Sequence, residues 1–240
     1  MRQQQFDFAR VDLMRSDDDG DQRLSSIDDR TRCLVQIAAA IAGAGESETR
    51  AVMENAIGRA EPSAVDEVII QSYLFAGFPR TLNAARMWRA VSGFAAPDKD
   101  ASADVVNGAD WVARGEETCR TIYGESYELL RENIAELHPA LDSWMITDGY
   151  GKVLSRPGLD LRTRELCIVA ACAAAGQQRQ LHSHLHGALN SGATVAEVID
   201  TLAALDSMVE PEQLDRYQSL LARVIAKRHP PQSAEAANVR

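Results

Sequence analysis

The chain has 240 residues, of which 45% are hydrophobic, 25% charged and 5% aromatic, as in an ordinary globular protein. The 25 Lys and Arg residues stand against 35 Asp and Glu, and this formal net charge of −10 argues against a nucleic-acid partner because like charges repel. There is no apolar run of about 18 residues and no apolar signal core, so we expect no membrane partner and a cytoplasmic location.

A polar, acidic stretch over residues 1–23 precedes the first helical pattern, and we expect it to form a disordered arm. Asp28 or Asp29 can cap a first helix, which should stop near Gly43. Apolar residues at helical spacing then predict a second helix over residues 47–59.

The next segment combines helix signals with strong breakers. Ser63-Ala64-Val65-Asp66 predicts the cap of a third helix, and Gly77-Phe78-Pro79 predicts an interruption before a helix over residues 81–91. Residues 96–110 lack periodicity and are rich in Gly, Ala, Pro, Asp and Ser, which is typical of a linker. We therefore expect a first domain over residues 24–95.

Helical patterning returns after the linker. It predicts helices over residues 111–123 and 126–137, a break at His138-Pro139, a short helix around Trp144 and a loop over residues 150–158.

The last part of the chain has the clearest helix boundaries. Asp160 can cap a helix that ends at Gly176, and a second helix should cover residues 178–191. Thr194-Val195-Ala196-Glu197 has the spacing of a capping box, and Pro211 fits the first turn of a last helix.

These patterns contain no convincing alternation of a strand, so the predicted fold class is all-α. We expect a second domain over residues 111–228 and a polar tail over residues 229–240.

The two domains share a motif. Asp28-x-Arg30-Thr31-Arg32-x-Leu34 recurs as Asp160-x-Arg162-Thr163-Arg164-x-Leu166, 132 residues later, and such self-similarity indicates a duplicated structural unit. The copies differ at two proton-carrying positions, because Glu165 aligns with Cys33 and His184 aligns with Val52. We therefore predict two tandem helical repeats packed as one compact unit, with a site in the second copy.

Glu165 and His184 are the candidate catalytic residues. Each lies on the apolar face of its helix, and in an antiparallel hairpin around Gly176 their axial offset would be about 4–5 Å. Side-chain reach or one water can bridge this offset, and a buried carboxyl group beside an imidazole suits general acid–base chemistry. The alternatives are a structural carboxylate held by Arg162, Arg164 or another subunit, and a hydrogen-bonded core histidine.

Other residues permit more than one interpretation. His182 and His186 could share a metal, but no third ligand has a recognisable spacing, so we expect a solvated helix face and no metal. An arginine of the second copy could receive a substrate carboxylate or form an ordinary ion pair; the candidates are Arg156, Arg162 and Arg164. The cysteines form no Cys-x-x-Cys pair, and we expect each to be a small buried residue.

Several motifs together resemble the carboxymuconolactone decarboxylase family, within the alkylhydroperoxidase-D-like superfamily. They are Tyr150-Gly151, Arg156-Pro157-Gly158-Leu159-Asp160, Arg162-Thr163-Arg164-Glu165-Leu166, Gln180-Leu181-x-x-His184 and, in the first copy, Tyr73-x-x-Ala76-Gly77-Phe78-Pro79. The resemblance covers about residues 25–95 and 111–225. It implies an all-helical fold and a homo-oligomer, either a trimer of tandem repeats or a dimer.

In the peroxidase branch of the superfamily that this chain resembles, the expected site is a proton relay of Glu, Cys-x-x-Cys and His. Glu165 and His184 match the ends of that relay, but Gln177 and Gln180 occupy the two cysteine positions. A glutamine cannot form a thiolate, so the dithiol mechanism has no nucleophile at this site.

The decarboxylase branch implies a small carboxylated, unsaturated lactone as substrate and no cofactor, because the substrate itself accepts the electrons. In this interpretation His184 donates a proton to carbon, Glu165 sets the protonation of His184, and an arginine or backbone amides stabilise the enolate. Arg162, Tyr150 and His186 are the expected substrate-binding residues. The alternatives are a peroxidase-like redox protein that uses Cys167 or Cys172, and a non-catalytic helical scaffold.

Overall fold

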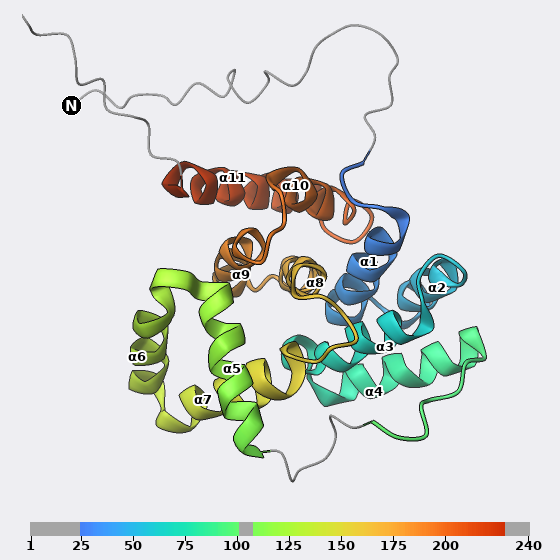
Figure 1. Cartoon of the computed structure of the whole chain (residues 1–240). Coiled ribbons are helices and arrows are strands. Elements are labelled where there is room, and N and C mark those ends of the chain that lie inside the picture. Colours follow the sequence, from blue (N-terminus) through green and yellow to red (C-terminus); the bar gives the residue numbers. More distant parts are fainter. Residues whose placement is uncertain (1–24, 101–107, 229–240) are drawn as a thin grey trace, which may run out of the picture.

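The computed structural model describes residues 25–100 and 108–228, and all regular structure in those ranges is helical (Figure 1). The helices are α1 (Asp29–Gly43), α2 (Glu46–Ala56), α3 (Pro62–Gln71), α4 (Tyr73–Ser92), α5 (Gly108–Tyr123), the 3₁₀-helix η5 (Gly124–Ser126), α6 (Tyr127–Leu137), α7 (Pro139–Trp144), the π-helix η6 (Met145–Leu154), α8 (Leu161–Ala174), α9 (Gln178–Asn190), α10 (Val195–Ala203) and α11 (Pro211–Arg228). The predicted all-α fold is confirmed.

Helix α8 lies at the centre of the molecule, with α1, α9 and α10 packed around it (Figure 1). Every residue from Thr163 to Ala173 is buried, so α8 is a core helix without a solvent-facing stripe. Small residues allow its close contact with α1, because a Cβ atom on Gly43 would lie 2.6 Å from the carbonyl oxygen of Ala174. Polar side chains on α8 are therefore held inside the protein.

Helices α1 and α8 begin with the same kind of cap. Oδ1 of Asp28 accepts the backbone N–H of Thr31 at 2.7 Å, and Oδ1 of Asp160 accepts that of Thr163 at 2.9 Å. A side chain that accepts from the third residue of the helix satisfies an otherwise unpaired backbone donor. Of the two caps considered for α1, Asp28 is the correct one.

Other helix boundaries test the sequence-based predictions directly. The capping box at Thr194-Val195-Ala196-Glu197 is confirmed, and Pro211 begins α11. The cap predicted at Ser63-Ala64-Val65-Asp66 is wrong, because α3 already begins at Pro62 with Glu61 as its N-cap. The fixed φ of proline suits the first helical position, and this preference outweighs the serine signal.

The interruption predicted at Gly77-Phe78-Pro79 is present as a kink inside α4. Gly77 has a φ of 77° and a ψ of 162°, a conformation that residues with a Cβ atom rarely adopt. The kink changes the direction of α4 between Phe75 and Phe78.

The loop predicted over residues 150–158 is wrong in its first half, because Tyr150–Leu154 belongs to η6. This π-helix packs tightly on α5: a Cβ atom on Gly151 would lie 1.9 Å from the carbonyl oxygen of Trp111, and one on Gly115 would lie 2.1 Å from that of Ile146. Gly151, which belongs to the predicted loop, and Gly115, which belongs to a predicted helix, instead allow the two backbones to touch.

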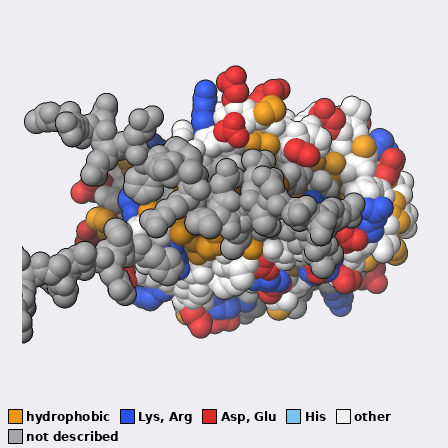
Figure 2. Space-filling model, turned by 90° about the horizontal axis from the view of Figure 1, so that it is seen from above, with side chains coloured by type: hydrophobic (Ala, Val, Ile, Leu, Met, Phe, Trp, Pro, Cys, Tyr) orange, Lys and Arg blue, Asp and Glu red, His pale blue; other side chains and the backbone are white. Residues whose placement is uncertain are grey.

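The expected arm over residues 1–23 and the tail over residues 229–240 lie outside the described residues. Of the predicted linker, residues 96–100 are irregular, whereas α5 already begins at Gly108. Within the described ranges, no helix has both the length and the apolar character needed to span a membrane. On the face seen from above α10 and α11, acidic and basic side chains are interspersed on the uncovered surface (Figure 2).

Candidate active site

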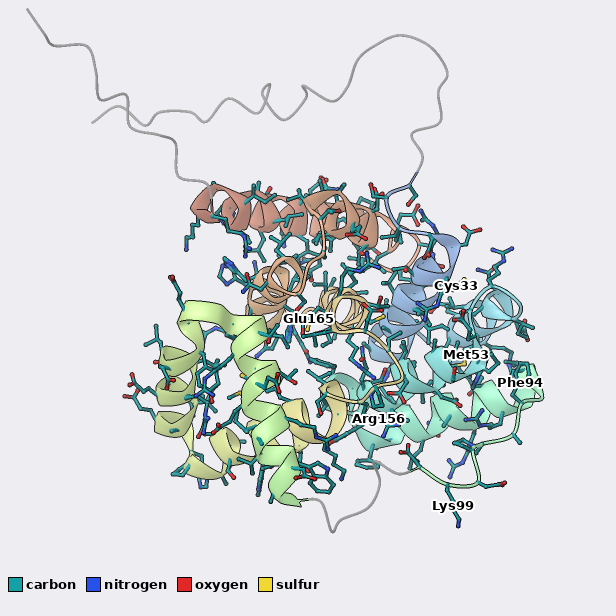
Figure 3. All side chains as sticks on the ribbon, viewed as in Figure 1. Cys33, Met53, Phe94, Lys99, Arg156 and Glu165 are labelled. Carbon is teal, nitrogen blue, oxygen red and sulfur yellow. The ribbon has the colours of Figure 1, made fainter. Side chains whose placement is uncertain are left out.

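The hairpin of α8 and α9 brings Glu165 and His184 together. The two helices meet at Gly176, whose φ of 68° reverses the chain, and Nδ1 of His184 lies 2.9 Å from Oε2 of Glu165. Glu165 is fully buried and His184 is 5% exposed, and Figure 3 shows Glu165 at the centre of the molecule. The pair thus forms a desolvated hydrogen bond of ordinary length between a carboxyl group and an imidazole.

A glycine on α9 makes room for this pair. A Cβ atom on Gly187 would lie 2.4 Å from Oε2 of Glu165 and 2.8 Å from Cγ2 of Ile122. The other carboxylate oxygen, Oε1 of Glu165, is buried and has no hydrogen-bond partner among the described residues. Such an unsatisfied acceptor is costly, and native proteins tolerate it mainly where function requires it.

Neither of the neighbouring arginines holds Glu165. Arg162 pairs with Glu197 at the start of α10, and the fully buried Arg164 donates to Glu67 at 2.7 Å. Glu165 is therefore not a structural carboxylate held by Arg162 or by Arg164.

A pocket of about 960 Å³ opens beside the pair, and His184 forms part of its wall. The edge of the His184 ring faces the ring of Phe75 from α4, with centroids 5.6 Å apart and planes at 83°. The wall is largely apolar, and α4, α7 and η6 supply most of it. Its apolar members include Ile70, Leu74, Phe75, Phe78, Leu141, Trp144, Met145, Val153 and Leu154.

Tyr150 also lines the pocket, and it has a partner that sequence analysis missed. Its hydroxyl lies 3.2 Å from that of Tyr123 on α5, and the two rings meet edge to face. Burial raises the pKa of Tyr123 to about 12 and raises the pKa of Tyr150 well above its ordinary value. Both groups are therefore neutral phenols, able to donate a hydrogen bond, at physiological pH. No sequence spacing links them, since the two residues lie 27 positions apart on different helices.

Among the described residues, four charged side chains line the pocket: Asp100, Asp148, Lys152 and Arg156. Arg156 is held by two carboxylates, because it donates to Glu67 at 2.7 and 2.9 Å and to Asp100 at 2.6 Å. These hydrogen bonds, from Glu67 first and from Asp100 as well, raise the pKa of Arg156 despite its burial.

Glu67 in turn joins Arg156 to Arg164 in a buried network that links α3 to α8. Burial alone would raise the pKa of Glu67, but the hydrogen bonds from Arg156 and Arg164 outweigh it, so the pKa is lowered. Arg156 is thus part of a structural ion network as well as of the pocket wall.

Arg162 and His186 lie elsewhere than the other predicted site residues. Arg162 does not line the pocket formed by the described residues, and its guanidinium is bound to Glu197. His186 packs against His182 on α9, with ring centroids 5.1 Å apart, and also lies outside the pocket wall. Among the residues that the structure covers, no group of three His, Cys, Asp or Glu side chains could hold a metal.

The described cysteines, Cys33, Cys119, Cys167 and Cys172, are all free and buried. Burial raises the pKa of Cys167 and of Cys172 to about 12. At physiological pH both are therefore thiols rather than nucleophilic thiolates, which counts against a peroxidase mechanism based on either.

Comparisons with known proteins point to one family. Residues 143–215 match the model of the carboxymuconolactone decarboxylase family, a segment that contains Tyr150, Glu165 and His184. The chain is 33% identical over 67 residues to 4-carboxymuconolactone decarboxylase of Acinetobacter baylyi. The aligned segment covers 28% of this chain and 50% of that protein. It is also 31% identical over 137 residues to Peroxisomal protein 2 of Schizosaccharomyces pombe. That aligned segment covers 55% of this chain and 62% of that protein. The chain thus spans between half and about three fifths of the relatives that it matches.

Proposed function

Because residues 143–215 of this chain belong to the carboxymuconolactone decarboxylase family, we propose that the protein is a cofactor-independent lyase that removes CO₂ from a small carboxylated lactone or related acid. The observation that carries the proposal is the position of His184, which lies in the wall of a 960 Å³ pocket and is bound through Nδ1 to the buried Glu165. This leaves Nε2 of the imidazole as the nitrogen that exchanges a proton with the substrate.

In the proposed reaction, the bond between a ring carbon and the leaving carboxylate breaks, and its electron pair moves into the conjugated lactone carbonyl. The neutral phenol of Tyr150, whose hydroxyl donates to Tyr123 in the free protein, turns its single O–H to the developing enolate oxygen. The imidazolium of His184 then transfers its proton to carbon, and Glu165 stabilises the charged imidazole. The pair recovers a proton from solvent after the product leaves.

The tandem organisation supports one site in each chain. In the proposed duplication, with repeats over residues 24–95 and 111–228, Cys33 and Val52 occupy the positions of Glu165 and His184. The first repeat still contributes to the site, because Phe75 of α4 packs on His184. We propose that it became a wall of the pocket when it lost its own acid and base, and that the chain forms a homo-oligomer, a trimer or a dimer.

The test measures turnover of 4-carboxymuconolactone in the variants Glu165→Gln and His184→Ala, with loss of the absorbance of the substrate as the readout. General acid–base groups contribute about 10²- to 10⁴-fold, so each variant should lose at least about a hundredfold in kcat/KM. His186→Ala is the matched control on the same helix and should retain activity. Wild-type turnover by both site variants would overturn the acid–base roles.

The scaffold alternative expects a closed interior beside His184, and the pocket at that position counts against it. The redox alternative needs a thiolate, and the raised pKa values of Cys167 and Cys172 count against that. Decarboxylation is the function that the described side chains support best.

A further inference from the structure

The charged groups of the pocket are not equivalent. Asp100 and Arg156 bind one another, and Arg156 also binds Glu67, so its guanidinium has two carboxylate partners. Lys152 lines the same pocket, and no described carboxylate lies within ion-pairing distance of its ammonium group. A cation in a mostly apolar wall without a counter-ion is suited to receive an anionic ligand.

The position of Lys152 is fixed by η6 and α5. Its Nζ lies 5.3 Å from the centroid of the Trp111 ring, a distance at which the ring attracts the ammonium group without neutralising it. The close contact of Gly151 with α5 holds this turn of η6 in place. Lys152 thus lines the pocket with its ammonium group over the Trp111 ring, and that group has no described carboxylate partner.

Asp148 lies four residues before Lys152 on η6 and also lines the pocket. Its carboxylate lies 3.4 Å from the hydroxyl of Thr147. Because like charges repel, Asp148 disfavours a carboxylate of the substrate in its own neighbourhood. The wall near Phe75 and His184 is apolar, so a carboxylate there is poorly solvated, and loss of neutral CO₂ from it is favoured.

We propose that Lys152 binds a carboxylate of the substrate that does not react, and that it thereby selects anionic lactones over neutral ones. The inference rests on the proposed function for the identity of the lactone, but not for the recognition of its charge. The bound carboxylate keeps all its atoms in the reaction. With that group at Lys152, the second carboxylate is directed towards Phe75 and His184.

The test uses two probes, an unsaturated γ-lactone with a carboxymethyl group and the methyl ester of that acid, with binding measured by calorimetry. Wild type should bind the acid about ten- to a hundredfold more tightly than the ester, as expected for a charge-assisted hydrogen bond. Lys152→Met should abolish this preference because it weakens the binding of the acid and leaves the binding of the ester unchanged. Lys152→Arg should retain most of the preference for the acid. Lys227→Met, an exposed residue on α11, is the control for the change in net charge.

The result separates the two proposals. Turnover of 4-carboxymuconolactone with an unchanged KM in Lys152→Met would overturn the role of Lys152 and leave the decarboxylase proposal standing. A preference for the acid that depends on Lys152, in a protein without decarboxylase activity, would uphold the anion site and reject the proposed reaction. Equal binding of acid and ester by wild type would also overturn the inference. Circular dichroism of each variant shows whether it is folded.

Discussion

Glu165 uses only one of its two carboxylate oxygens. Oε2 bonds His184, whereas Oε1 is buried without a partner among the described residues. A buried acceptor without a hydrogen bond costs about 1–3 kcal/mol, and an apolar side chain at residue 165 would avoid that cost. Cys33, which the proposed duplication aligns with Glu165, is such a side chain. A carboxylate at residue 165 therefore costs stability, and the proposed acid–base role beside His184 gives a reason for it.

Gly187 tests how closely the pair must be positioned. In Gly187→Ala the new methyl group would meet Oε2 of Glu165 at 2.4 Å, so the carboxylate must move away from His184. A displacement of about 1 Å can cost about a hundredfold in rate, whereas alanine inside a helix is intrinsically favourable by about 1 kcal/mol. We expect a folded protein with kcat lowered by about a hundredfold, measured as turnover alongside thermal unfolding.

Gly108→Ala is the matched control, since a Cβ atom there has no neighbour within 4 Å, and it should leave kcat unchanged. Full activity in Gly187→Ala would show that the contact between Glu165 and His184 is not required.

At the scale of elements, the sequence predicts most of the helices and part of the site. Glu165 and His184 could be identified because they belong to one hairpin, in which spacing from Gly176 determines proximity. Tyr123 and Lys152 could not, because their positions depend on how η6 packs on α5. Sequence patterns predict a loop over residues 150–158, since nothing local reveals that the backbone of α5 packs where Gly151 lacks a side chain.

The contact between α5 and η6 should therefore be the most sensitive element contact near the pocket. In Gly115→Ala the added methyl group would lie 2.1 Å from the carbonyl oxygen of Ile146 and 3.0 Å from the backbone nitrogen of Gly151. Neither atom can rotate away, so the helices must separate. Overpacking typically costs about 1–3 kcal/mol, and in a protein of this size each kcal/mol lowers Tm by about 2–4 °C.

We expect Gly115→Ala to lower Tm by several degrees in a calorimetric scan and to weaken substrate binding, because η6 carries Tyr150 and Lys152. Gly149→Ala on the same π-helix has no neighbour within 4 Å and serves as the control. Equal Tm values for the two variants would contradict the packing role of Gly115.

At the scale of the whole molecule, the two halves of the chain meet in a buried ion network. Glu67 of α3 contacts Arg156 and Arg164, which come from the second half. Gln71 of α3 adds hydrogen bonds to the side chain and the backbone of Arg164. The network lies next to the pocket, so the packing of α3 on α8 and the shape of the pocket depend on the same side chains.

Glu67 should make stability depend on pH in the acid range. Its pKa in the folded protein lies below the ordinary value of 4.5 because its hydrogen bonds from Arg156 and Arg164 outweigh burial. Its contribution to the free energy of unfolding is therefore complete above about pH 4.5 and is lost as pH falls through the lowered pKa. Removal of one partner from a buried ion pair costs about 3–5 kcal/mol, because Arg164 would keep an uncompensated charge in the core. Glu67→Gln should lower stability by about that amount at pH 7, measured by urea unfolding followed by circular dichroism. It should also flatten the loss of stability below pH 4.5.

Glu212→Gln provides the control, since its side chain is 92% exposed and lies 4.0 Å from Arg216, and it should change stability little at either pH. Equal effects of the two substitutions would show that the network does not hold the two halves together.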